Sequence, residues 1–175
     1  MRYGGELCVD FPRLPLTDRL KLFRALATLG GRLVSLHMLQ SLSQNALRTA
    51  FVGRRSVEIS RVAWCNDTAW IDAPASKKGA KQQSGTTGFK GLPEEVWSFH
   101  IGGYQVCEKW LKDRKGRTLS DEDIAHYHKI VVALAETIRL MKEIDEVIEQ
   151  HGGWPGAFVT TPPEGASSQG EPPFA

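Results

Sequence analysis

The chain has 175 residues, of which 41% are hydrophobic and 24% are charged, and its formal net charge is +2 at pH 7. This length suits one domain with a single buried core, and the composition is that of an ordinary soluble globular protein. The net charge is too small to indicate nucleic-acid binding by itself, so such a function has to rest on local clusters of charge.

Cysteine usage and hydropathy predict an intracellular protein. The three cysteines lie far apart and form no CxxC pair, which argues against a zinc ribbon and against a disulfide framework. No apolar signal-peptide region follows Met1, and no stretch approaches the roughly 20 apolar residues that cross a bilayer. We therefore expect a cytoplasmic protein that makes no membrane contact.

The N-terminal part predicts an extended lead-in followed by a helix. Two prolines keep residues 1–16 out of a helix. Thr17 is the expected N-cap, and leucines then recur at steps of three and four as far as Leu36. Gly30 and Gly31 interrupt this stripe, either because two helices meet there or because the helix passes close to a neighbouring backbone. We favour a helix with a break.

The middle of the chain predicts a small antiparallel sheet. The pattern of residues 57–71 predicts a hairpin that turns at Asn66 and Asp67. The Lys-, Ser-, Gly- and Gln-rich stretch at about 74–91 has no apolar periodicity, so we expect a mobile loop there. A third strand is predicted over residues 96–101.

Helices are predicted again in the C-terminal part. One begins at about Tyr104 and ends near Gly116, a residue type that often follows the last turn of a helix. Ser120 and Asp123 resemble a capping box in which Asp replaces the usual Glu. They begin a helix of about 30 residues, in which apolar positions follow a three-four spacing as far as Ile148.

The order of these elements predicts the fold class and the domain limits. A helix, two or three strands with a long loop, a second helix and a long final helix indicate an α+β fold. In such a fold a small antiparallel sheet packs on helices, here with a long C-terminal amphipathic helix. We expect one domain over residues 17–155, a lead-in over 1–16, and a disordered tail over 156–175.

The sequence contains no recognised catalytic motif. A phosphate-binding glycine loop, a Walker lysine motif, a GxSxG elbow and an HExxH pair are all missing. His126 and His128 are two residues apart, so on a helix they face different directions, and we expect them to flank a buried Tyr127 rather than to bind a metal. We expect neither catalysis nor a metal nor a cofactor in this chain.

Charge is segregated between two adjacent predicted elements. Residues 105–117 carry five cations against two carboxylates, whereas residues 120–151 carry three cations against eight carboxylates. Basic clusters of this kind fit contact with the phosphate backbone of DNA. The alternative is a solvated helix end whose cations offset the helix dipole. The predicted phosphate contacts are Lys109, Lys112, Arg114, Lys115 and Arg117, and a second basic cluster in the loop is Lys77, Lys78 and Lys81.

Two long segments are similar to a known family. The segments "DFPRLPLTDRLKLFRALATLGGRLVSLHML" and "VWSFHIGGYQVCEKWLKDRKGRTLSDEDIAHYHKIVVALAETIRLMKEID" resemble the C-terminal specificity region of the Type ISP restriction–modification enzymes. The resemblance covers about residues 10–148. Its structural-motif residues here are Trp97, Gly102, Gly103, Tyr104 and Trp110. We expect Trp97, Phe99 and Trp110 to pack in the core rather than to stack on bases, and the two glycines to permit a tight strand-to-helix passage.

The resemblance implies that this chain corresponds to one part of a larger enzyme. Enzymes of that family join a nuclease, an ATP-driven translocase, an N6-adenine DNA methyltransferase and a target-recognition region, and the motifs of the first three are missing here. The resemblance therefore implies a non-catalytic DNA-binding target-specificity module. Its implied partners are double-stranded DNA and the methyltransferase/translocase portion of such an enzyme.

Two points remain open at the level of the sequence. The alternative function is a structural docking domain that packs on a methyltransferase or a partner helix without touching DNA. A methionine directly before the motif is expected for a truncated protein, a split gene or a gene remnant.

Overall fold

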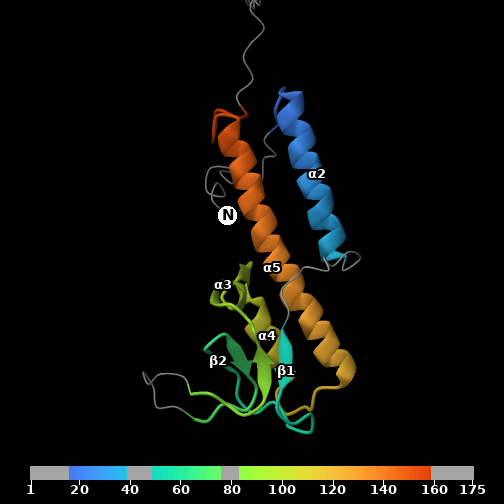
Figure 1. The fold of residues 1–175 in the computed structure, drawn as a ribbon, viewed down its shortest axis with the longest axis vertical. Coiled ribbons are helices and arrows are strands. Elements are labelled where there is room, and N and C mark those ends of the chain that lie inside the picture. Colours follow the sequence, from blue (N-terminus) through green and yellow to red (C-terminus); the bar gives the residue numbers. More distant parts are fainter. Residues whose placement is uncertain (1–15, 39–48, 76–82, 159–175) are drawn as a thin grey trace, which may run out of the picture. The chain divides into compact units, whose positions relative to one another are not determined.

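The computed structural model describes residues 16–38, 49–75 and 83–158, and the chain divides into two compact units. Unit 1 comprises the residues up to Gly30 and those from Glu143 onward, and unit 2 comprises Gly31–Lys142. Two helices, α2 (Leu20–His37) and α5 (Asp121–Gln150), run through both units (Figure 1). The fold is α+β with a small antiparallel sheet and a long C-terminal helix, as the sequence predicts.

Unit 1 is built around a small apolar cluster. Leu22 of α2, Ile148 of α5 and Ala157 of the turn that follows α5 are all buried. Thr17 closes this cluster at its edge, because its hydroxyl donates a hydrogen bond to the carbonyl oxygen of Ala157 (3.0 Å). The half-buried residues that pack on the cluster are Leu26, Ile144, Val147 and Phe158.

Helix α2 differs from its prediction at two places. It begins at Leu20, so Thr17 is not its N-cap; the Thr17 hydroxyl accepts a hydrogen bond from the Arg19 N–H (3.2 Å) ahead of the helix. The helix also continues through Gly30 and Gly31, and no other segment of the described chain lies within 4 Å of a Cβ placed there. The predicted break is wrong, because a glycine in a helix costs about 1 kcal/mol but does not by itself end the helix.

Unit 2 contains a four-stranded antiparallel sheet with the strand order β1-β4-β3-β2. The strands are β1 (Ala50–Val52), β2 (Ala63–Cys65), β3 (Thr68–Trp70) and β4 (Gly88–Lys90). Strands β2 and β3 form the predicted hairpin, and Asn66 and Asp67 have φ angles of 53° and 50°. Two consecutive positive φ angles are those of a type I′ turn, for which Asn and Asp are suited, so the predicted turn is confirmed.

Two strands lie where the sequence predicts none, and the β2–β3 hairpin is shorter than predicted. Strand β4 falls inside the loop expected at 74–91, and β1 lies in a segment whose ambiguous pattern predicts the end of the helical region. Each strand has three residues, which is too short for an alternating pattern to be recognised. Phe89 of β4 is fully buried and pairs with Phe51 of β1 and Ala69 of β3, so these contacts between distant segments define both strands.

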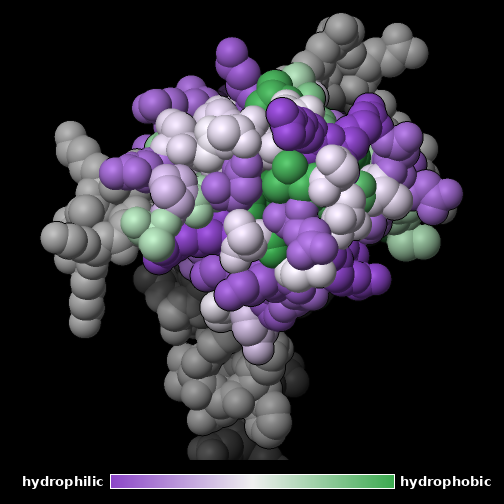
Figure 2. All heavy atoms as spheres, turned by 90° about the horizontal axis from the view of Figure 1, so that it is seen from below, coloured by the Kyte–Doolittle hydropathy of each residue, from purple (hydrophilic) through white to green (hydrophobic). Residues whose placement is uncertain are grey.

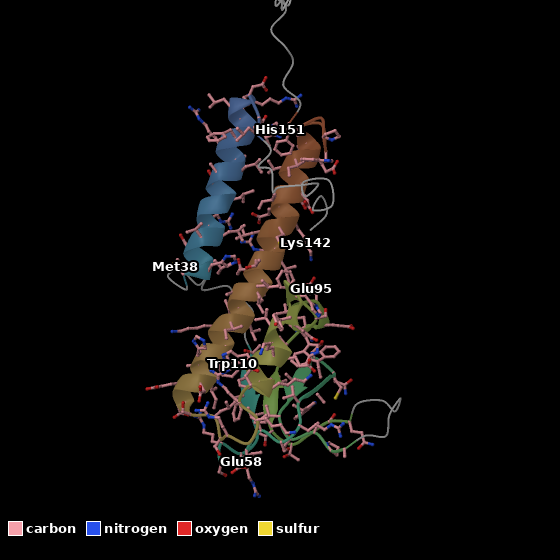
Figure 3. All side chains as sticks on the ribbon, turned by 180° about the vertical axis from the view of Figure 1, so that it is seen from behind. Met38, Glu58, Glu95, Trp110, Lys142 and His151 are labelled. Atoms are coloured by element: carbon pink, nitrogen blue, oxygen red, sulfur yellow. The ribbon has the colours of Figure 1, made fainter. Side chains whose placement is uncertain are left out.

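The third predicted strand, over 96–101, is wrong in its first half. Residues Glu94–Trp97 form the short helix α3, and the strand β5 is limited to His100–Ile101. Pro93 and two glutamates in the first turn favour the start of a helix, and this preference outweighs the apparent alternation. Within unit 2, Lys142 of α5 lies near Glu95 of α3, with its Nζ 3.0 Å from the carboxylate Oε2 (Figure 3).

The helix predicted from Tyr104 begins two residues later. Tyr104–Gln105 form β6, which pairs with β5, and α4 follows as Val106–Lys112. Gly102 and Gly103 therefore make the turn of a β-hairpin and not a strand-to-helix passage. Gly102 has φ = 60°, a positive angle that type II′ hairpin turns place at the first turn position, where glycine is favoured.

The capping box at the start of α5 is confirmed. The Ser120 Oγ accepts a hydrogen bond from the Asp123 N–H (3.1 Å), and the Asp123 Oδ2 accepts one from the Ser120 N–H (3.2 Å). Beyond this cap, α5 places fully buried Tyr127 and Val131 in the core of unit 2. The other buried residues of this core are Ile59, Ala69, Ile71, Phe89, Leu92, Val96, Trp97, Cys107, Leu111, Leu119, Ile124 and Leu134.

Half-buried His128 next to this core predicts a pH dependence of stability. Its ring lies 5.4 Å from that of Phe89, its Nδ1 is hydrogen-bonded to the Thr49 hydroxyl, and burial lowers its pKa from the usual 6.5. The unfolded chain therefore binds a proton at higher pH than the folded chain does. We expect the free energy of unfolding to fall as pH drops below about 6.5, and to fall less steeply in His128→Gln. Urea titrations at pH 7.5 and 5.5 give the free energy of unfolding of each protein at both pH values. If the free energy fell by the same amount in the wild type and in His128→Gln, this role of His128 would be contradicted.

Candidate nucleic-acid interface

Helix α4 carries most of the predicted phosphate contacts, and its buried face fixes its orientation. Cys107 and Leu111 are fully buried in the core of unit 2. The Tyr127 hydroxyl of α5 donates a hydrogen bond to the Cys107 carbonyl oxygen (3.4 Å). The opposite face of α4 is then left to Lys109 and Lys112, which are exposed. This is the arrangement of an amphipathic helix that presents its charges to solvent.

The turn after α4 is joined to a segment more than 50 residues earlier in the chain. The Gly116 N–H donates a hydrogen bond to the Ile59 carbonyl oxygen (2.8 Å), and the Ile59 N–H donates one to the Arg117 carbonyl oxygen (3.0 Å). An antiparallel bridge between Glu58 and Thr118 extends this pairing. The pairing brings residues 59–62 beside the basic end of α4.

A pocket of about 430 Å³ lies between these two segments. Arg61 comes from the earlier segment, and Lys112 and Lys115 come from the end of α4 and the turn that follows it. Glu108 is the one carboxylate in the lining, so three cations and one acid give the pocket a formal charge of +2. The remaining lining residues are Ile59, Ser60 and Val62.

A second pocket of about 340 Å³ continues along the same helix. It is lined by Lys109 and Asp113 together with four residues of the β5–β6 hairpin, His100, Gly103, Tyr104 and Gln105. Glu108 and Lys112 line both pockets, so the two hollows adjoin at this pair of side chains. We refer to the two pockets together as the α4 groove.

Several of the predicted cations form ion pairs within the molecule. Lys109 and Lys112 each pair with an acid one turn away on α4, Asp113 and Glu108, with N–O distances of 2.8 Å in both cases. Both lysines remain about half exposed, and surface pairs of this kind contribute only about 0–1 kcal/mol. Such a pair is easily exchanged for a phosphate, so pairing leaves both lysines available to an anion.

Arg114 has a different environment from the other cations of this stretch. Its guanidinium carbon lies 3.5 Å from the centre of the Trp110 ring, and its Nε lies 3.5 Å from the Asp123 Oδ1. Trp110 itself packs against buried Tyr127 where α4 meets α5 (Figure 3), with 5.1 Å between ring centres. Stacking and pairing together hold Arg114 as part of the fold.

The cations predicted from the sequence differ in their ion pairing and in whether they line the α4 groove. Within the described chain, Lys115, Arg117 and Arg61 form no ion pair, and all three are exposed. Lys109, Lys112 and Lys115 come together on the α4 groove, whereas Arg117 does not line it. The second predicted cluster, Lys77, Lys78 and Lys81, lies outside the described residues. Among the motif aromatics, Trp97 is buried and Phe99 and Trp110 are half-buried against the core.

Arg61 lines the α4 groove although it lies outside the basic clusters of the sequence. It stands alone among uncharged neighbours, and only the pairing of residues 58–59 with 116–118 places it near Lys115. The sole signal in the sequence is an arginine within an alternating segment, which is too common to be diagnostic.

The described residues contain no cluster of metal-ligating side chains. Among them no group of three or more His, Cys, Asp or Glu side chains is placed to hold a metal ion. Burial raises the pKa of the Cys107 thiol to about 12, so this cysteine stays protonated at neutral pH.

The end of unit 2 drawn lowest in Figure 1 shows mainly hydrophilic residues around a few hydrophobic ones (Figure 2). None of the described helices combines the length and the apolar character that crossing a bilayer requires.

The family model of the Type ISP C-terminal specificity domain matches residues 1–143. The chain therefore belongs to this family, as the resemblance of its motifs predicts. The family description indicates a target-recognition role in restriction–modification enzymes. The match contains the whole α4 groove and ends at Glu143, where the second part of unit 1 begins. No curated protein and no solved structure matches the chain.

Proposed function

We propose that this chain is a non-catalytic DNA-specificity module of an adenine-methylating restriction–modification system, and that its α4 groove contacts the phosphate backbone of duplex DNA. The observation that carries the proposal is the convergence of Arg61, Lys112 and Lys115 on one pocket from two distant segments. Lysine and arginine side chains bind DNA phosphates by releasing condensed counterions. A groove with a net positive lining next to a helix suits a negatively charged backbone.

The test compares salt-dependent DNA binding by the full chain and by the variant Arg61→Ala/Lys112→Ala/Lys115→Ala. With a fluorescein-labelled 30-bp duplex of mixed sequence, we expect the variant to bind about 10- to 100-fold more weakly at 0.1 M salt. The slope of log affinity against log salt should become shallower by about 2–3, because each phosphate contact contributes roughly 0.9. Arg114 is excluded from this variant because it stacks on Trp110 and its loss would disturb the fold.

A matched control removes the same amount of charge elsewhere. Lys21, Arg24 and Lys129 are exposed cations that do not line the α4 groove. Their triple alanine variant has the same net charge as the test variant, so it should bind DNA within about threefold of the wild type. Equal losses in the two variants would show that total charge, and not the groove, determines binding.

A docking role without DNA contact is the second candidate function, and one observation favours it. Helix α2 exposes Leu20 and Phe23, with exposed fractions of 57% and 54%, on the part that lies in unit 1. Exposed apolar side chains at helical spacing fit a partner helix. An absence of DNA binding at 50 mM salt, together with tight association with a methyltransferase chain, would establish docking in place of DNA recognition.

A further inference from the structure

A second element beside the α4 groove exposes large apolar side chains. Ile101 and Tyr104 face each other across the β5–β6 hairpin, and their exposed fractions are 55% and 62%. The two turn residues between them, Gly102 and Gly103, have no other part of the described chain within 4 Å of a Cβ placed on either. The tip of the hairpin is therefore narrow and has no side chains, and the apolar pair Ile101 and Tyr104 flanks it on the two strands.

The base of this hairpin is anchored although its tip is free. The Gln105 side-chain amide donates a hydrogen bond to the Trp97 carbonyl oxygen (2.6 Å), and Trp97 is buried in the core. The Val106 N–H donates a hydrogen bond to the carbonyl oxygen of Phe99, which packs against the same core (3.4 Å). The apolar pair is thus held on a fixed support, so little conformational entropy is lost when it meets a partner.

Positive charge lies directly beside the apolar tip. The Lys109 Nζ is 5.5 Å from the centre of the Tyr104 ring. Tyr104 and His100 also line the α4 groove together with Lys112. Tyr104 also lines a third, open pocket of about 360 Å³, to which Ile101, Val106 and Trp110 contribute apolar side chains and Lys109 and Asp113 contribute charged ones. Over the whole α4 groove, which the hairpin borders, four lysine and arginine side chains stand against two carboxylates, so the formal charge of the groove is +2. This excess of positive charge is complementary to a polyanion, and it favours DNA over an apolar protein surface as the occupant.

We propose that the β5–β6 hairpin enters a groove of the duplex and that Ile101 and Tyr104 contact base edges there; this inference rests on the proposed DNA-binding function. The major groove of B-DNA admits a two-stranded β-ribbon, and the glycine tip permits close approach of the backbone. An aliphatic side chain meets the thymine methyl group, and a tyrosine hydroxyl donates to or accepts from a base edge. The lysines of the α4 groove position the domain, and the hairpin supplies sequence preference.

The experiment selects DNA from a library and compares sequence enrichment with bulk affinity. The full chain and the variant Ile101→Ala/Tyr104→Ala are each incubated with duplexes that carry a random 12-bp segment, and bound DNA is sequenced after successive rounds. We expect the wild type to enrich a sequence motif, and the variant to reduce its preference for that motif by about 10-fold or more. The variant keeps every cation of the α4 groove, so its binding to a mixed-sequence 30-bp duplex should keep the wild-type slope of log affinity against log salt, whatever affinity the loss of Tyr104 costs. Phe23→Ala, which removes an exposed aromatic ring from α2, should retain the full preference.

Each other outcome has a distinct meaning. Equal enrichment by the wild type and the hairpin variant overturns the hairpin's role and leaves the proposed function standing. DNA binding by the wild type without any enriched motif also overturns the hairpin's role, and of the proposed function it keeps only the phosphate contact. Failure of the wild type to bind any duplex at 50 mM salt overturns the proposed function itself. Unchanged enrichment, with weaker association of the hairpin variant with a methyltransferase chain, would assign the tip to a protein contact and overturn this inference.

Discussion

Replacing Tyr127 with alanine should lower the free energy of unfolding by about 3–5 kcal/mol, the range for removing a buried aromatic ring. Tyr127 is fully buried, and its ring centre lies 4.3 Å from that of Phe89 in the sheet and 5.1 Å from that of Trp110 on α4. A single side chain of α5 therefore contacts both the sheet and the helix that carries the α4 groove. Urea denaturation followed by tryptophan fluorescence measures the change.

The variant Tyr127→Phe distinguishes the contribution of the ring to the free energy of unfolding from that of the hydroxyl. It keeps the aromatic packing and loses only the hydrogen bond to the Cys107 carbonyl oxygen, so the expected loss is about 1 kcal/mol. Burial raises the pKa of the Tyr127 hydroxyl well above 10, so this donor stays protonated throughout the accessible pH range. If the alanine and phenylalanine variants lost the same stability, the hydroxyl and not the ring would be the main source of stabilisation.

This packing also relates stability to function. The Cys107 carbonyl, which accepts the Tyr127 hydrogen bond, lies one residue before Glu108 and two before Lys109, both of which line the α4 groove. A rigid core under the helix holds these side chains in position. We therefore expect a partly destabilised variant to lose DNA affinity through displacement of α4 even though its cations are intact.

The features predicted correctly from the sequence depend on residues close together in the chain. The capping box at Ser120 and Asp123 and the Asn66-Asp67 turn are each defined by a few consecutive residues whose side chains or φ angles decide the local structure. The long helix α5 repeats its apolar pattern over many turns, so its signal accumulates. The family motif is equally contiguous, and the match over 1–143 confirms it.

The features that the sequence did not reveal depend on contacts between distant segments. Strands β1 and β4 are three residues long and exist because they pair with each other and with β3. Contacts between distant segments also complete the candidate site. The basic stretch after Gln105 is visible in the sequence, but Arg61 comes beside it only through the hydrogen bonds between Ile59 and the turn at Gly116. The predicted helix extends across β6, so the sequence pattern does not reveal the hairpin at Gly102.

Gly88 is the one glycine in the strands of the four-stranded sheet, and Gly88→Ala should lower the free energy of unfolding by about 2–3 kcal/mol. A Cβ at this position would lie 2.3 Å from the Ala69 carbonyl oxygen and 2.9 Å from the Trp70 Cα, and both atoms belong to the backbone of β3. A backbone cannot rotate away as a flexible side chain does, so the strands must separate where Trp70 pairs with Gly88.

Gly103→Ala provides the matched control, because it adds the same methyl group where no other segment of the described chain lies within 4 Å of it. Gly103 also lacks the positive φ angle of Gly102, so alanine is compatible with its backbone and the expected change is below about 0.5 kcal/mol. Thermal and urea unfolding of the two variants measure the contrast. Because Gly88 pairs with Trp70 in the centre of the sheet, a Gly88→Ala protein as stable as Gly103→Ala would mean that β3 and β4 are farther apart than the structure places them.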